Sequence, residues 1–105
     1  MRERMESDFC QEAVKVFKAL SDPTRYEIVR MLVCSEELGC QDFEFVFRKS
    51  KPAMSHHYRV LENAGLVANR KAGLRVYYRL ERRQLDRFMP QFYRVHCGGA
   101  RRSAD

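Results

Sequence analysis

Four polar side chains fall on one side of a helix that the sequence predicts for residues 50–66. They are Lys51, Ser55, His56 and Arg59. An ammonium, a hydroxyl, an imidazole and a guanidinium group together can bind phosphates and hydrogen-bond to base edges. The plain alternative is a solvated helix face. We predict that all four contact DNA, and the sequence leaves open which of them contact bases and which contact phosphates.

A second group of cations, Arg70, Lys71 and Arg75, follows this helix directly. These residues belong to two stretches, 66–71 and 75–80, on either side of Ala72-Gly73. In the second stretch apolar and basic side chains alternate, as in a β-strand with one buried face, and the intervening glycine suits a hairpin turn. We predict a hairpin whose cations contact phosphates rather than serving solubility alone. Each phosphate neutralised should add about one unit to the salt slope of DNA binding.

The cysteines are the remaining residues with reactive side chains. Cys10, Cys34, Cys40 and Cys97 are widely spaced and form no C-x-x-C pair, so a disulfide framework is not predicted for a reducing compartment. Thiolates favour soft or borderline ions such as zinc, Cu(I) or trivalent arsenic. Cys10, Cys40 and Cys97 are the candidate metal ligands. The cofactor stays unknown, a thiophilic metal or metalloid ion or none, because a buried cysteine is commonly just a small hydrophobe.

The helix that positions the first polar group has clear boundaries. Ser50 is a good N-cap, Pro52 sits in the first turn where its missing N–H costs nothing, and Gly65 suits a left-handed cap. The other side of the helix is an apolar stripe with the helical period, made of Ala53, Met54, His57, Val60, Leu61 and Ala64. Because His57 lies on this stripe, we expect a satisfied core histidine there.

Three further helices are predicted before it, over residues 7–20, 22–34 and 40–47. Asp22 can cap the second of these helices. The third is short and joins the 50–66 helix by a tight turn. These two make a helix-turn-helix in which the 50–66 helix is the DNA reader. Because a basic hairpin follows at once, the predicted architecture is a winged helix.

The first helix and the last helix carry more apolar residues than one small core requires. The last helix is predicted for residues 82–97, with a bend at Pro90, whose ring removes one backbone hydrogen bond. These two helices are our candidates for a homodimer interface. The predicted interface residues are Phe9, Ala13, Phe17, Phe88, Phe92 and His96.

The length of 105 residues indicates one domain, residues 1–105, in which 1–6 and 98–105 are expected to be tails. A hydrophobic fraction of 45% indicates a folded chain, and a net charge of +6 favours polyanionic partners. The sequence has no apolar run of about 18 residues and no apolar segment typical of a signal peptide at its start. We therefore expect a cytoplasmic protein with no membrane partner.

Three motifs in combination resemble the ArsR/SmtB repressors. They are ALSDPTR at residues 19–25, SHH at 55–57 and LENAGLV at 61–67, and the resemblance covers about residues 14–80. It implies a mainly α fold with a small β-hairpin, a winged helix-turn-helix of five helices and a two-stranded wing that dimerises through its first and last helices. It also implies a palindromic double-stranded DNA operator, from which a metal ion, a metalloid or an oxidant releases the dimer.

The sensor positions of that family are occupied differently here. The family's thiolate segment is E-L-C-V-C-D-L, whereas residues 37–43 read E-L-G-C-Q-D-F, with Cys40 between the two cysteine positions. The family's zinc pattern on the last helix is also missing, because the residue two positions after Asp86 is not a histidine. A redox pair on the second and last helices is echoed only loosely by Cys34 and Cys97.

The predicted function is a sequence-specific DNA-binding transcriptional regulator, a homodimeric repressor released by a metal ion, a metalloid ion or a redox change. One alternative is a DNA-binding regulator with no metal or redox site. Another is a winged-helix module that mediates protein contacts, which the intact basic hairpin disfavours. An enzyme is not predicted, because the sequence has no Gly-rich phosphate loop and no nucleophile elbow.

Overall fold

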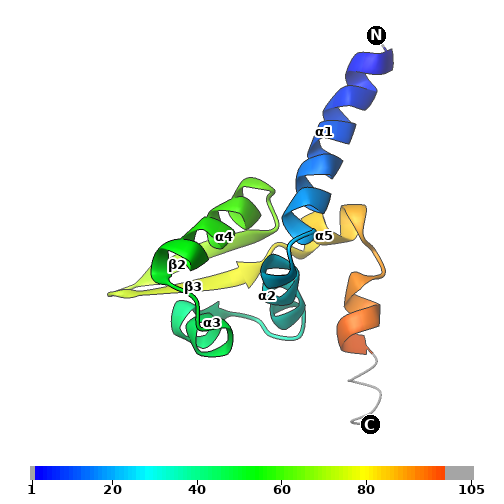
Figure 1. Ribbon diagram of the computed structural model, residues 1–105. Helices are drawn as coiled ribbons and strands as arrows, with labels where there is room; N and C mark the ends of the chain where they lie inside the picture. Colours follow the sequence, from blue (N-terminus) through cyan, green and yellow to red (C-terminus); the bar gives the residue numbers. More distant parts are fainter. Residues whose placement is uncertain (1, 99–105) are drawn as a thin grey trace.

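The computed structural model describes residues 2–98, and it combines helices with a small antiparallel sheet (Figure 1). The helices in this range are α1 (Arg2–Leu20), α2 (Pro23–Val33), α3 (Cys40–Phe47), α4 (Lys51–Asn63), α5 (Arg82–Phe88) and a π-helical turn, η1 (Arg94–Gly98). The strands are β1 (Leu38–Gly39), β2 (Val67–Ala72) and β3 (Arg75–Leu80), in the order β1-β3-β2. This is the predicted winged helix-turn-helix.

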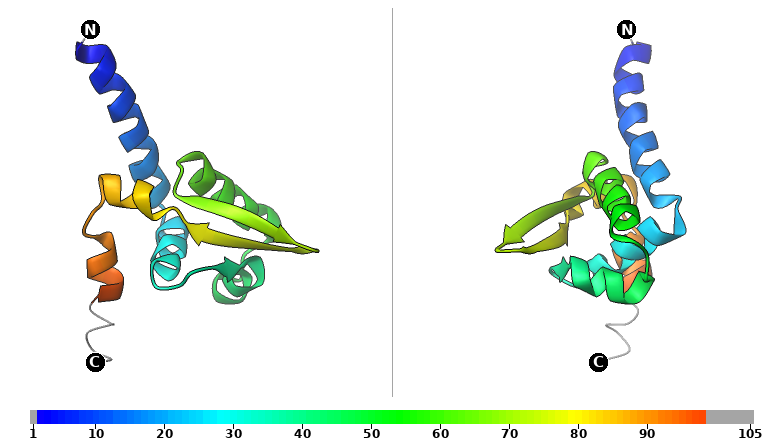
Figure 2. Two further views of the ribbon diagram at one scale, coloured as in Figure 1. Left: turned by 180° about the vertical axis from the view of Figure 1, so that it is seen from behind. Right: turned by 60° about the vertical axis from the view of Figure 1, so that its left-hand side comes forward.

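The hairpin of β2 and β3, called the wing below, projects from one side of the helical body (Figure 1, Figure 2). The N-terminal part of α1 projects in another direction, and η1 lies on the side of the body away from the wing tip. No described helix is both long enough and apolar enough to cross a lipid bilayer.

The core lies where α2, α4 and the base of the wing meet. Ile28, Leu32, Leu61 and Leu66 are each at most 1% exposed. Burying an aliphatic side chain of this size contributes about 1.5–3 kcal/mol, so this cluster fixes α4 against α2. The position of α4, the predicted DNA-reading helix, therefore depends on apolar packing behind it.

Helix α4 has the predicted cap at each end, although its last residue, Asn63, comes three residues before the predicted end at Leu66. The backbone N–H of Ala53 donates to Ser50 Oγ at 3.2 Å, which caps the first turn. At the other end Gly65 has a φ of 75°, and the Gly65 and Leu66 N–H groups donate to the Glu62 and Leu61 carbonyls at 2.9 and 3.0 Å. These two bonds form a Schellman motif, in which glycine takes the left-handed position at little cost.

The wing forms the predicted hairpin, and a third strand joins it. Strands β2 and β3 form an antiparallel ladder that begins with Val67 opposite Leu80 and ends with Ala72 opposite Arg75. On the other side of β3, β1 pairs Leu38 with Tyr78. No strand was predicted between the helices over residues 22–34 and 40–47, because a strand of two residues shows no alternating pattern.

Two predicted boundaries differ from the structure. Helix α1 begins at Arg2, so residues 2–6 belong to a helix and not to a tail, while residues 99–105 of the second predicted tail lie outside the described residues. The predicted bent helix over residues 82–97 is two separate pieces. Pro90 cannot donate a helical hydrogen bond and disfavours helical geometry in the preceding residue, so Met89 adopts φ −139° and ψ 70° and ends α5.

Candidate nucleic-acid interface

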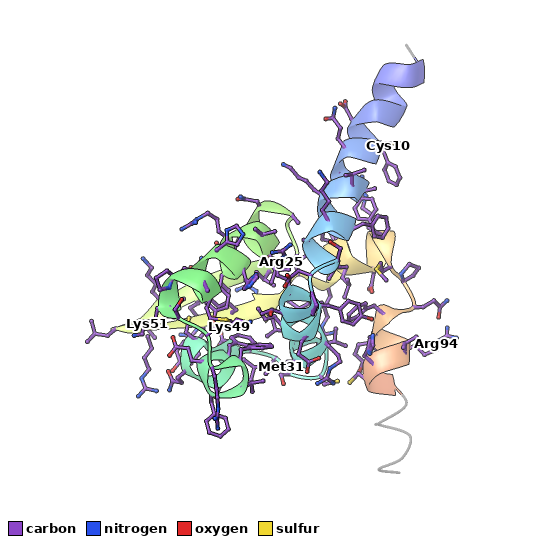
Figure 3. All side chains as sticks on the ribbon, in the orientation of Figure 1. Cys10, Arg25, Met31, Lys49, Lys51 and Arg94 are labelled. Atoms are coloured by element: carbon purple, nitrogen blue, oxygen red, sulfur yellow. The ribbon has the colours of Figure 1, made fainter. Side chains whose placement is uncertain are left out.

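Helix α4 presents the predicted DNA-reading residues to solvent. Lys51, Ser55, His56 and Arg59 are all exposed, while Met54, Tyr58 and Leu61 on the opposite side are buried. Lys51 lies at the end of α4 nearest the wing, far from Arg94 on η1 (Figure 3). The four predicted side chains thus share one accessible surface, which carries two cations and two hydrogen-bonding groups.

The predicted wing cations are exposed as well, but they are not equivalent. Arg70 donates two hydrogen bonds to the Glu37 carboxylate, at 2.9 and 2.7 Å, and its guanidinium lies 4.8 Å from the centre of the Tyr77 ring. The hydrogen bonds from Arg70 lower the pKa of Glu37. Lys71 and Arg75 lie farther out on the wing, next to its tip. The predicted phosphate contact would require Arg70 to leave Glu37, whereas no carboxylate lies within salt-bridge distance of Lys71 or Arg75 among the described side chains.

His57 lies on the inner side of α4, as the apolar stripe predicted. Its imidazole Nδ1 is 3.2 Å from Arg25 Nη1 and 3.9 Å from the Asp22 carboxylate, and its side chain is 14% exposed. Burial lowers the pKa of His57, and the Asp22 charge opposes this only in part. A neutral imidazole can accept the Arg25 hydrogen bond at Nδ1, which links α4 to the start of α2.

Two residues behind this surface were missed by the sequence analysis. Arg25 was assigned no role in this surface, but its Nε donates to the Ala19 carbonyl at 2.9 Å, and the side chain joins α1, α2 and α4 (Figure 3). Tyr58 was not assigned to the apolar stripe, yet it is 5% exposed and its ring stacks on Tyr78 at 4.5 Å. The signal for Tyr58 was its spacing of four residues after Met54.

The candidate metal ligands lie on separate parts of the chain. Cys10 is on the projecting part of α1 (Figure 3), Cys40 begins α3, and Cys97 is buried in η1. Within the described residues, no group of three or more His, Cys, Asp or Glu side chains is arranged to hold a metal ion. One folded chain therefore does not bring these three thiols together.

Cys34 and Cys97, in contrast, are neighbours. Cys34 lies at the end of α2, and its thiol donates to the His96 carbonyl at 3.6 Å. Burial raises the pKa of the Cys34 thiol, and a hydrogen bond and charge interaction with Cys97 raise it further. The loose echo of a redox pair in the sequence thus corresponds to two thiols in contact.

The residues predicted for a dimer interface divide into two groups. Phe9 and Phe17 on α1 are 50% and 47% exposed, and their rings contact Phe88 of α5 at centroid distances of 5.2 and 6.4 Å. Ala13, on the same helix, is partly buried. The prediction for Phe92 needs correction, because this ring is 2% exposed and packs on Tyr26 inside the chain's own core. His96 is held there too, with its Nε2 2.6 Å from the Tyr26 hydroxyl.

Comparison with known proteins identifies the family. The sequence model described as "Bacterial regulatory protein, arsR family" matches residues 22–69. The arsenical resistance operon repressor of Staphylococcus xylosus is 40% identical over 76 residues, which cover 72% of this chain and 72% of that protein. The chain belongs to the arsR family of bacterial regulatory proteins. The resemblance seen in the sequence motifs is therefore confirmed.

Other members of the arsR family agree with this assignment. The cadmium resistance transcriptional regulatory protein CadC homolog of Staphylococcus aureus is 43% identical over 70 residues, covering 67% of this chain and 58% of that relative's length. The structure of reduced HlyU from Vibrio cholerae N16961 aligns with a TM-score of 0.73 and 28% identity, over 90% of this chain and 98% of that one. This arsR-family chain is a DNA-binding transcriptional repressor and not an enzyme, as predicted.

Proposed function

We propose that this protein is a homodimeric repressor that binds a palindromic operator and leaves it when Cys34 and Cys97 are oxidised to a disulfide. In the bound state α4 lies in the major groove, and the wing lies against the adjacent backbone. The inducer is an oxidant, rather than a metal ion held by Cys10, Cys40 and Cys97.

The exposed polar side of α4, fixed from behind by buried residues, carries the DNA-binding part of this proposal. Lys51, Ser55, His56 and Arg59 are exposed on that side. The cations of the wing are exposed as well. In helix-turn-helix proteins the second helix reads the major groove, while neighbouring elements contact the backbone. Two copies related by a two-fold axis would read two half-sites of a palindrome.

The contact between the Cys34 and Cys97 thiols supports the redox part. Oxidation joins the two sulfur atoms and removes two protons and two electrons, which hydrogen peroxide accepts as it is reduced to two water molecules. The new bond would tie η1 to the end of α2. Because η1 follows α5, and α5 carries Phe88 of the predicted dimer interface, a change there can alter the spacing of the two α4 helices. The homologous structure of reduced HlyU shares this fold.

The DNA-binding part is tested by fluorescence anisotropy on DNA from the protein's own promoter region. Arg59→Ala should weaken binding by about 5- to 100-fold, the usual range for a lost base contact. Arg94→Ala is the matched control, because it removes the same charge from the opposite side of the molecule (Figure 3). Equal affinities for the two variants would refute α4 as the reading helix.

The redox part is tested by adding peroxide to the protein–DNA complex. Wild-type protein should dissociate, lose the mass of two hydrogens and rebind after reduction with a dithiol. Cys34→Ser should stay bound, and Cys40→Ser, the control, should behave as wild type. Release of the Cys34→Ser variant by zinc or arsenite would instead support the metal site predicted for Cys10, Cys40 and Cys97.

A further inference from the structure

Gln84 on α5 connects two helices that belong to different parts of the molecule. Its side-chain nitrogen, Nε2, donates to the Glu12 carboxylate on α1 at 3.1 Å and to the carbonyl of Ala64 at 3.1 Å. Ala64 is the C-cap residue of α4. A primary amide nitrogen carries two hydrogens, so these two bonds use its full donor capacity. The side chain of Gln84 thus joins α1, α5 and the end of α4.

The bond to Ala64 supplies a partner that α4 itself does not provide. Carbonyl groups at the end of an α-helix have no acceptor role left within the helix and need other donors. The Schellman motif uses the carbonyls of Leu61 and Glu62, whereas the Ala64 carbonyl lies beyond them and accepts from Gln84. Because Ala64 is only 5% exposed, removal of that donor would be costly. Gln84 therefore restrains the C-terminal end of α4.

The bond to Glu12 is part of the contact between α1 and α5. The second carboxylate oxygen of Glu12 accepts from Arg87 Nη1 at 2.9 Å. The Arg87 guanidinium lies 5.4 Å from the centre of the Phe9 ring and 5.0 Å from that of Phe88. These two rings belong to the predicted dimer interface. A continuous series of contacts therefore runs from the aromatic surface of α1 and α5, through Arg87, Glu12 and Gln84, to the end of α4.

The end of α4 that Gln84 holds is close to a predicted DNA contact. Arg59 precedes Ala64 by less than two helical turns, so a shift of this end also moves the Arg59 guanidinium. We propose that Gln84 is a positioning residue for DNA binding, which holds α4 in the orientation set by α1 and α5 and so favours the operator over other DNA. This inference rests on the proposed role of α4 as the reading helix.

Specific and non-specific DNA binding should respond differently to the loss of Gln84. Non-specific binding arises from phosphates neutralised by Lys and Arg, and it does not require a side chain to be aligned with a base edge. Contacts to bases require that alignment. The quantity to measure is therefore the ratio of the affinity for operator DNA to the affinity for unrelated DNA.

The test compares the protein's own promoter DNA with a shuffled duplex of equal length, by fluorescence anisotropy. Gln84→Met keeps most of the side-chain length but has no N–H donor, and it should lower the affinity ratio about three- to tenfold, the effect of roughly one net hydrogen bond. Gln91→Met is the matched control, because Gln91 is exposed and lies outside α5. Its affinity ratio should stay within about twofold of wild type.

Circular dichroism and sedimentation velocity establish that each variant is folded and has the oligomeric state of wild type. Gln84→Lys then separates hydrogen bonding from packing, because an ammonium group can donate to both acceptors. The added charge strengthens binding to both duplexes, so the affinity ratio should return to within about twofold of wild type. An unchanged ratio in Gln84→Met, a ratio in Gln84→Lys as low as in Gln84→Met, or a change of oligomeric state in Gln84→Met would each overturn the inference.

The connection to α1 is tested by a double-mutant cycle. Glu12→Ala should lower the affinity ratio, and the double variant should be no lower than Gln84→Met alone, because both changes break the same series of contacts. Additive losses would show that the two residues act independently and would overturn the inference.

Arg59→Ala distinguishes this inference from the proposed function. Loss of the operator preference in Arg59→Ala, with a normal preference in Gln84→Met, would overturn the inference alone. Loss in Gln84→Met, with a normal preference in Arg59→Ala, would overturn the base contact assigned to Arg59 and leave Gln84 as the positioning residue. A normal preference in both variants would overturn both.

Discussion

At the scale of single residues, the predicted DNA-reading surface of α4 depends on a polar contact beneath it. Arg25 bonds to the Ala19 carbonyl and to His57 Nδ1, so one guanidinium connects the end of α1, the start of α2 and the middle of α4. The contact requires an imidazole that accepts a hydrogen bond, and protonation of His57 would place two cations against each other. The orientation of α4 is therefore coupled to the protonation state of His57.

This coupling predicts a loss of stability in mild acid. Burial lowers the pKa of His57 below its usual 6.5 in the folded chain, so the unfolded chain binds a proton first as the pH falls. His57 therefore supports full stability above pH 6.5, and its contribution declines as the pH falls from there toward the folded-state pKa. Urea unfolding midpoints at about pH 7.5 and 5.5 should show this decline.

The matched variants for this prediction are His57→Gln and His56→Gln. His56 is exposed on the same helix, so His56→Gln should keep the wild-type pH dependence. His57→Gln should make the urea unfolding midpoint less dependent on pH. Asp22 does not affect this comparison, because its pKa is lowered from 3.8 and lies below the pH range of the experiment. Burial raises the pKa of Asp22, but the hydrogen bond from the Arg25 backbone N–H and the nearby positive charges lower it by more. The same pH dependence in both variants would show that His57 is not responsible.

At the scale of elements, the capping of α4 is a local feature with a measurable cost. Ser50 Oγ accepts a hydrogen bond from the Ala53 N–H, and no other side chain among the described residues caps that end. Ser50→Ala should lower the free energy of unfolding by about 1 kcal/mol, the typical cost of losing such a cap. Urea unfolding would measure this as a lower midpoint at an unchanged slope.

Ser55→Ala is the control for the cap, since it makes the same change on the exposed side of α4. It should change the free energy of unfolding by less than about 0.5 kcal/mol. Ser55→Ala should instead weaken DNA binding, because Ser55 is a predicted contact. If both variants lose the same stability, the hydrogen bond from Ala53 to Ser50 contributes little.

Caps and turns also explain which elements the sequence could predict. Helices α2, α3 and α4 and the wing have local signals, such as Asp22, Ser50 and Gly65, and their predicted boundaries agree with the structure within about three residues. Strand β1 has no local signal, since Leu38 and Gly39 form a strand only because β3 lies beside them. The effect of Pro90 was underestimated, because two backbone constraints act there together.

The candidate site was predicted less evenly than the fold. Exposure of the polar residues on α4 follows from the helical period, so the sequence was enough for them. The Arg70–Glu37 pair and the Arg25–His57 contact join residues that are distant in sequence, and no local pattern predicts them. The same holds for the contact between Cys34 and Cys97, which depends on where η1 packs after the break at Pro90.

At the scale of the whole molecule, no element within residues 2–98 covers the aromatic surface on α1 and α5. Phe9 and Phe17 remain about half exposed while they contact Phe88. Large aromatic side chains that share an exposed surface commonly belong to a protein interface. The projecting N-terminal part of α1 extends this surface away from the body (Figure 2), where a second copy can pack against it.

Phe17→Ala should therefore shift the protein from dimer toward monomer in sedimentation velocity experiments. Truncating an interface aromatic commonly costs more than about 1 kcal/mol, a fivefold or larger rise in the dissociation constant. Phe45→Ala is the control, because Phe45 on α3 is 80% exposed and lies away from α1 and α5. Phe92→Ala should differ from both variants: its main effect should be a lower free energy of unfolding, because the Phe92 ring lies in the core. An unchanged sedimentation profile for Phe17→Ala at micromolar concentration would place the dimer interface elsewhere, and the two α4 helices would then need another arrangement to reach a palindrome.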